Sequence, residues 1–141
     1  MCLRITEKSL KYRPRGKRWV TRYKLVRATS YRSTGYGSTK PRLVSLQVLA
    51  AVRPGIMRSN RHGRLLSRDE LKMMEVGFGI HVYKHKVRAW PEELLIAVRC
   101  DPRDFVARGV FRHQTSEVWT KVWVPKSEVK RALALALARS E

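Results

Sequence analysis

The chain has 141 residues, of which 43% are hydrophobic, so it can bury one core and is not a disordered chain. It carries 31 Lys and Arg against 11 Asp and Glu, and its formal net charge of +20 indicates an anionic partner: nucleic acid, a phosphate-rich nucleotide, an acidic protein or an anionic membrane. The longest uncharged run has about ten residues, about half of what a membrane-spanning helix needs. With no secretion signal and two cysteines far apart in sequence, we expect reduced thiols and a cytoplasmic protein without a membrane partner.

The positive charge is concentrated near the start of the chain. Residues 1–43 contain 13 of the basic residues and one acid, Glu7. Within this part, residues 11–24 (KYRPRGKRWVTRYK) place seven Lys or Arg among fourteen residues, with aromatic side chains between them. We expect one domain spanning residues 1–141, with residues 1–18 as a basic arm for which mobile and ordered states are both open.

Residues 19–26 (WVTRYKLV) alternate in the manner of a half-buried strand. Trp19, Tyr23 and Leu25 fall on one face of this strand, and Arg22 and Lys24 fall on the other. The pattern predicts that the aromatic face is buried and that the basic face points outward.

Residues 28–41 are rich in Ser, Thr and Gly and end in Pro41, so they are predicted to form a long loop. A loop of this length in a compact domain is usually functional or mobile. Residues 42–52 form an apolar run for which a strand is favoured over a helix, and residues 53–66 are predicted to form a second basic loop.

Ser67 and Glu70 have the spacing of a capping box, and Gly77 follows the last apolar positions, so residues 67–77 are predicted to contain a helix. Residues 78–85 are predicted to form a strand.

Residues 91–100 and 117–125 are also predicted strands. Between them, Asp101 as a cap and Pro102 at the first helical position predict a short helical turn. Residues 127–141 are predicted to form an amphipathic C-terminal helix. Its apolar stripe consists of Val129, Ala132, Leu133, Ala136 and Leu137.

These elements predict an α+β single domain. We expect a small, mostly antiparallel sheet of four or five short strands, with two or three helices including the C-terminal one.

Residues 35–40 (GYGSTK) have a superficial likeness to a phosphate-binding loop. In a P-loop the Lys precedes the hydroxyl residue and a helix follows directly, whereas here Lys40 follows Thr39 and precedes Pro41. A flexible loop that presents Tyr31, Arg32 and Tyr36 to a ligand and an ordinary surface loop both remain open.

His81 and His85 have the spacing of a helical metal pair, but the β-branched and aromatic residues around them favour a strand. No carboxylate or thiol lies near them in sequence, so no metal site is expected. A ligand pocket that contains His81, Tyr83 and Lys84 is one alternative, and a structural histidine is the favoured one.

Trp119, Lys121 and Trp123 would share one face of the strand 117–125. Two Trp beside a cation can stack on nucleobases. Burial of this face under the C-terminal helix, with Lys121 reaching solvent, is the favoured alternative.

No arrangement of Ser, His, Cys or acidic residues matches a catalytic site, so no catalytic residue and no cofactor are expected. Glu92, Glu93 and Glu117 have no chemical role by this reasoning, and their Gln variants are expected to keep the function. An enzyme that acts on nucleotides through His81 remains a weaker alternative.

The residues expected to bind phosphate come from the basic start of the chain and from the second basic loop, since many Lys and Arg give affinity for any polyphosphate. They are Lys11, Arg13, Arg15, Lys17, Arg18, Arg22, Lys24, Arg27, Arg32, Arg58, Arg61 and Arg64. Tyr31 and Tyr36 are expected to stack on bases.

Short motifs along the chain, MCLRIT at the start, GFGIHVYKH in the middle and VRCDPRDFVARG near the end, resemble a loose family of small phage and prophage proteins. The central motif departs from that family because Gly79 and Ile80 stand between Phe78 and His81. The resemblance implies a phage accessory protein made in the bacterial cytoplasm, with no established activity.

The order of elements also resembles the sheet of ADP-ribosyltransferases. In such enzymes a Glu-x-Glu pair precedes the late strand, and alignment on VWVP (residues 122–125) places Trp119 and Lys121 in those two positions. The resemblance therefore implies a related sheet without the catalytic carboxylates.

We expect a non-enzymatic accessory protein that binds nucleic acid and antagonises a host defence system. The alternatives are sequestration of a small signalling nucleotide, inhibition of an acidic or nucleic-acid-binding host complex, and an ADP-ribosyltransferase-like enzyme.

Overall fold

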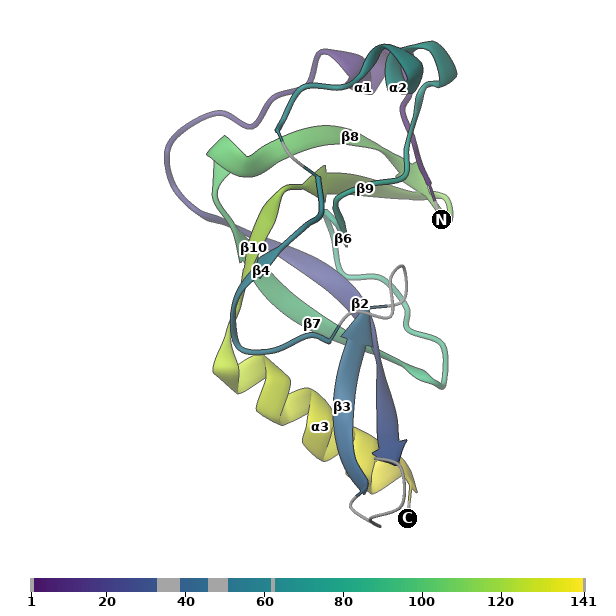
Figure 1. Cartoon of the computed structure of the whole chain (residues 1–141), viewed down its shortest axis with the longest axis vertical. Helices are drawn as coiled ribbons and strands as arrows, with labels where there is room; N and C mark the ends of the chain where they lie inside the picture. The colour runs from purple at the N-terminus through teal and green to yellow at the C-terminus, as the bar shows by residue number, and fades with distance from the viewer. Residues whose placement is uncertain (1, 33–38, 46–50, 62, 141) are drawn as a thin grey trace.

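The computed structural model describes residues 2–32, 39–45, 51–61 and 63–140, with the backbone alone at residues 29–32, 39–41 and 140. Within these ranges it contains a ten-stranded antiparallel sheet and three α-helices, so the predicted α+β class is confirmed (Figure 1). The ten strands exceed the four or five expected from sequence.

The strands are β1 (Leu3–Arg4), β2 (Val20–Arg32), β3 (Thr39–Ser45), β4 (Gly55–Arg58), β5 (Glu75–Val76), β6 (Ile80–Tyr83), β7 (Glu93–Cys100), β8 (Phe105–Phe111), β9 (Gln114–Trp119) and β10 (Lys121–Val124). The helices are α1 (Glu7–Leu10), α2 (Arg68–Met73), α3 (Lys126–Ser140) and the 3-10 turn η1 (Pro102–Asp104). The strand order is β4-β10-β7-β2-β6-β9-β8-β1-β5, and β3 pairs with β2.

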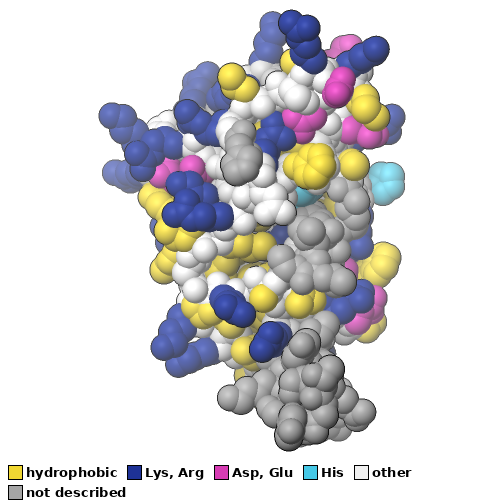
Figure 2. All heavy atoms as spheres, viewed as in Figure 1, with side chains coloured by type: hydrophobic (Ala, Val, Ile, Leu, Met, Phe, Trp, Pro, Cys, Tyr) yellow, Lys and Arg dark blue, Asp and Glu magenta, His cyan; other side chains and the backbone are white. Residues whose placement is uncertain are grey.

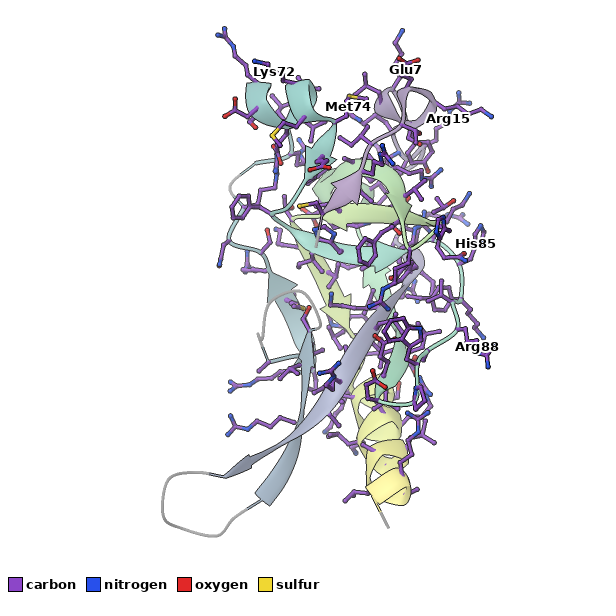
Figure 3. The ribbon with its side chains drawn as sticks, turned by 90° about the vertical axis from the view of Figure 1, so that its right-hand side faces the viewer. Glu7, Arg15, Lys72, Met74, His85 and Arg88 are labelled. Atoms are coloured by element: carbon purple, nitrogen blue, oxygen red, sulfur yellow. The ribbon has the colours of Figure 1, made fainter. Side chains whose placement is uncertain are left out.

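The long strand β2 organises the sheet. One edge of β2 pairs with β7 from Val20 to Arg27, and the other edge pairs with β6 at Tyr23 and with β3 from Val26 onward. Along this second edge, β2 therefore pairs first with β6 and then with β3. The paired ends of β2 and β3 project from the rest of the molecule (Figure 3).

The main core lies on the inner face of this curved sheet. Ile96, Val98, Phe105 and Trp119 are among its fully enclosed side chains, and the ring of Phe105 meets that of Trp119 edge to face. From α3, Val129 and Ala132 are buried and Leu133 and Ala136 are partly buried against the core. The predicted stripe is thus confirmed except at Leu137, which is 52% exposed.

Helix α3 also covers an edge of the sheet, because β10 pairs with β7 only at Arg99. Glu128 accepts a hydrogen bond from the N–H of Ala97 at 2.7 Å, Arg131 donates to the carbonyl of Leu95 at 2.7 Å, and Arg139 donates to that of Glu93 at 2.8 Å. Side chains of α3 therefore occupy edge groups of β7 that could otherwise recruit another strand.

A second, smaller core contains Leu3, Ile5, Val76 and Val118. The first residues of the chain are therefore part of the body, and residues 13–18 follow α1 across its surface.

Several local predictions are confirmed. The side chain of Ser67 caps α2, with Glu70 completing the capping box, and Asp101 caps η1 with Pro102 at its start. However, α2 ends at Met73, and its C-cap Met74 has a left-handed conformation, so the helix stops before Gly77.

Other predictions are wrong. Parts of both expected loops are strands, since β2 and β3 include residues 28–32 and 39–41, and β4 lies within residues 53–66. The predicted strand 117–125 is broken at Thr120, whose N–H donates to the carbonyl of Asp104 at 2.8 Å. Residues 105–111 form β8, which the sequence patterns did not indicate.

Cys2 is exposed and Cys100 is buried, and both are free thiols. In the described ranges, no helix has the length and apolar character required to span a membrane.

Candidate nucleic-acid interface

The predicted orientation is wrong for Arg22 and Lys24, which point inward, whereas Leu25 is buried as predicted. Lys24 is only 2% exposed, whereas Trp19 is 45% exposed. Arg22 and Lys24 share the inner face with Val26, and their register partners on β7 are core residues. Arg22 and Lys24 are therefore poor candidates for phosphate contacts.

Glu117 of β9 is the internal partner of Arg22. Its carboxylate is fully buried and accepts hydrogen bonds from Nε of Arg22 and, at 2.7 Å, from Nη2 of Arg108. The indole N–H of Trp119 donates to the same carboxylate at 3.3 Å, and the guanidinium of Arg108 lies over the ring of Tyr12. This cluster joins β2, β8 and β9 and gives two enclosed arginines a shared counter-charge inside the protein.

Lys24 is held next to His81. Its ammonium donates to the carbonyl of His81 at 3.0 Å, and burial lowers the pKa of Lys24 to about 8. Burial, followed by the charge of Lys24, also lowers the pKa of His81 to about 4. His81 and Tyr83 are both buried and Lys84 is half-buried, so the expected ligand pocket at these residues is not an open one.

Arg61 also has a structural role. Its guanidinium is 10% exposed, bonds both carboxylate oxygens of Glu70 and donates to the carbonyls of Gly63 and Leu65. It therefore shapes the loop before α2, and its pairing lowers the pKa of Glu70. Its assignment as a phosphate contact is not supported by this geometry.

The other basic residues of that loop face two adjoining hollows with volumes of about 810 and 830 Å³, which share Gly63, Arg64 and Arg103 in their walls. We call these two hollows the basic groove. Five cationic side chains line it from four separate segments of the chain and remain available to solvent: Arg13, Arg58, Arg64, Arg103 and Lys121. In Figure 2, Lys and Arg side chains gather at the upper left of the molecule, where the segment between α1 and β2 runs in Figure 1.

Two acids also line the basic groove. Asp101 accepts from Arg103 at 2.7 Å, which lowers the pKa of Asp101, and Asp104 lies 3.9 Å from the ammonium of Lys121. The guanidinium of Arg103 is nevertheless 84% exposed. Among the described residues, Arg58 has no hydrogen-bonding or ionic partner. The basic groove therefore has a net positive charge and free donors for an anion.

The surface segment before β2 extends the charge of the basic groove. Arg15, Lys17 and Arg18 are exposed there, next to Arg13, and Figure 3 shows Arg15 pointing away from the body. Lys11 and Arg27 are also exposed, outside the walls of the groove. The side chains of Tyr31 and Arg32, and the whole of Tyr36, lie outside the described residues.

The sequence patterns did not mark Arg103 or Arg99 as binding residues. Arg103 lies in the helical turn η1, and Arg99 lies on β7, whose apolar sequence predicts a buried strand. Arg99 is exposed and lies opposite Trp123 of β10. Trp119 and Trp123, expected on one face, are separated by the break at Thr120. Trp119 is in the core, and Trp123 is 42% exposed.

In the described part of the chain, no group of three or more His, Cys, Asp or Glu side chains could hold a metal ion. No family model, curated protein or solved structure matches the chain. The proposed function therefore rests on the geometry and charge of the basic groove.

Proposed function

We propose that the protein binds nucleic acid along the basic groove. The observation that carries this proposal is the convergence of five solvent-accessible cations from four segments of the chain on one concave surface. Self-repulsion makes such convergence costly unless a polyanion neutralises it. A nucleic acid would place its phosphates along the groove and release counterions.

Arg58 and Arg64 keep the role expected from sequence, as does Arg13. Arg103 and Lys121 join them. Arg15, Lys17 and Arg18 would contact phosphates beyond the groove, because they follow Arg13 on the same surface segment. The role as a phage accessory protein that antagonises a host defence rests on the sequence resemblance alone.

The test is fluorescence anisotropy with a labelled oligonucleotide of about 20 nucleotides and mixed sequence. The groove variant combines Arg13→Gln, Arg58→Gln and Arg64→Gln, none of which removes an ion pair found in the structure. At about 0.1 M salt, loss of three phosphate contacts should weaken binding by about a hundredfold.

The matched control combines Lys72→Gln, Arg88→Gln and Lys130→Gln. These residues are exposed, lie on α2, on the connection before β7 and on α3, and do not line the groove (Figure 3 labels Lys72 and Arg88). The control removes the same net charge, so it should weaken binding by less than about fivefold. Equal losses in the two variants would show that total charge, and not the groove, governs binding.

A further inference from the structure

The outer face of the sheet carries two exposed tryptophans on either side of an arginine. Trp19 precedes β2, Arg99 lies on β7 and Trp123 lies on β10, and the three line a hollow of about 360 Å³. Arg99 pairs in register with Trp123 on one side and with Thr21 of β2 on the other. We call this arrangement the tryptophan platform.

The platform does not have the features of an ordinary protein surface or a protein core. Both indoles keep close to half of their surface exposed, although large aromatic side chains are usually buried. No hydrogen bond or ion pair engages Arg99 among the residues that the structure describes. An apolar protein partner would bury that guanidinium without a counter-charge, which is unfavourable.

The platform adjoins the basic groove. Trp123 and Lys121 lie two residues apart on β10, and their register partners on β4 are Ile56 and Arg58. Residues two apart on a strand point to the same face and lie about 7 Å from each other. Lys121 and Arg58 line the groove, so one strand pair links the phosphate-binding cations to the exposed indole.

We propose that the tryptophan platform stacks unpaired nucleobases and makes the protein select single-stranded over double-stranded nucleic acid. This inference rests on the proposed function, since the groove supplies the phosphate contacts. Indole faces stack on bases of any sequence, and Arg99 between them can pair with a phosphate or stack on a base. In a duplex the base faces are already stacked on one another and cannot reach the indoles.

The test compares a single strand with the duplex of the same sequence, using wild type, Trp19→Ala, Trp123→Ala and Trp123→Phe. Wild type should bind the single strand more tightly. Each Ala variant should weaken single-strand binding by about ten- to a hundredfold and leave duplex binding within about twofold, while Trp123→Phe should retain most of the affinity.

Ile56→Ala is the matched control, because Ile56 is an exposed apolar side chain opposite Trp123 that does not line the hollow. It should change neither affinity by more than about twofold. Near-ultraviolet circular dichroism confirms that each variant is folded.

Equal loss on single strand and duplex, or no loss in either Trp variant, would overturn the platform while leaving the groove intact. If wild type bound neither nucleic acid at low salt, both proposals would fall together.

Discussion

The guanidinium of Arg22 on β2 binds the carboxylate of Glu117 on β9, although β6 separates the two strands in the sheet. The pair crosses the inside of the curved sheet, and Arg108 of β8 binds the second carboxylate oxygen. Both arginine side chains are only 12% exposed. Water therefore cannot solvate either guanidinium well enough to replace its ion pair with Glu117.

Glu117→Gln is expected to lower the free energy of unfolding by about 3 to 5 kcal/mol, because it leaves two enclosed guanidinium groups without their counter-charge. Urea denaturation followed by circular dichroism measures this loss. Glu92→Gln, at an exposed site, is the control and should change stability little. Equal stability of the two variants would show that the cluster is not a structural centre.

The same Glu117→Gln variant is expected to keep its affinity for nucleic acid under conditions where it remains folded. The buried carboxylate lies away from the walls of the groove and has no chemical role in our proposal. Loss of binding in the folded variant would favour an enzymatic or ligand-contacting role for Glu117.

Lys24→Met tests the reassignment of the inward-facing basic residues. Lys24 is enclosed and bonded to the carbonyl of His81, so its replacement should leave the affinity for a single-stranded oligonucleotide within about twofold. Arg58→Gln, in the groove, should weaken binding about fivefold at 0.1 M salt, the effect of one phosphate contact. Anisotropy titrations of both variants would contradict this assignment if Lys24→Met had the larger effect.

The low pKa of His81 makes stability depend on pH. Its pKa of about 4 in the folded protein is below the ordinary value of 6.5, so the unfolded chain binds the proton first as the pH falls. Stability should therefore decrease as the pH falls from 6.5 toward 4. Between pH 6.5 and 5 the loss should be about 1 to 2 kcal/mol.

His81→Leu should flatten that part of the pH profile, because it removes the titrating group. Glu70, Asp101 and Glu128 also have lowered pKa values, but they contribute below about pH 4.5, so they do not obscure the test. An unchanged slope in the variant would place the pH dependence elsewhere.

The two thiols should differ in reactivity. Burial raises the pKa of Cys100, so its thiolate is scarce and shielded, whereas Cys2 is exposed. Titration with a thiol reagent at pH 8 should modify one cysteine in the native protein and both in urea. Cys2→Ser should abolish the native reaction, and a remaining fast reaction would show that Cys100 is accessible.

Features set by neighbouring residues could be predicted from the sequence. The capping box of Ser67 and Glu70, the turn at Asp101 and Pro102, and the stripe of α3 depend on contacts within a few positions, which the local pattern contains. The alternation of β2 was also predicted, but the direction of its faces was not. Period-two alternation does not say which face is internal when a distant acid such as Glu117 can neutralise an inward arginine.

The basic groove could be predicted only in part. Arg13, Arg58 and Arg64 could be predicted from local charge, whereas Arg103 on η1 and Lys121 on β10 reach the groove through the tertiary arrangement, which the sequence does not display. The tryptophan platform could not be predicted from the sequence for a similar reason. The break at Thr120 reverses the strand faces, so Trp119 enters the core and Trp123 emerges beside Arg99.

The salt dependence of oligonucleotide binding tests the central claim most directly. With about eight phosphates contacted, five by groove cations and three by Arg15, Lys17 and Arg18, a plot of log affinity against log salt for a single strand should have a slope of about −5.6, which is about a two-thousandfold loss between 50 and 200 mM salt. The variant that combines Arg13→Gln, Arg58→Gln and Arg64→Gln should show a slope shallower by about 2. A flat response in wild type, or the same slope in both proteins, would contradict binding of nucleic acid in the basic groove.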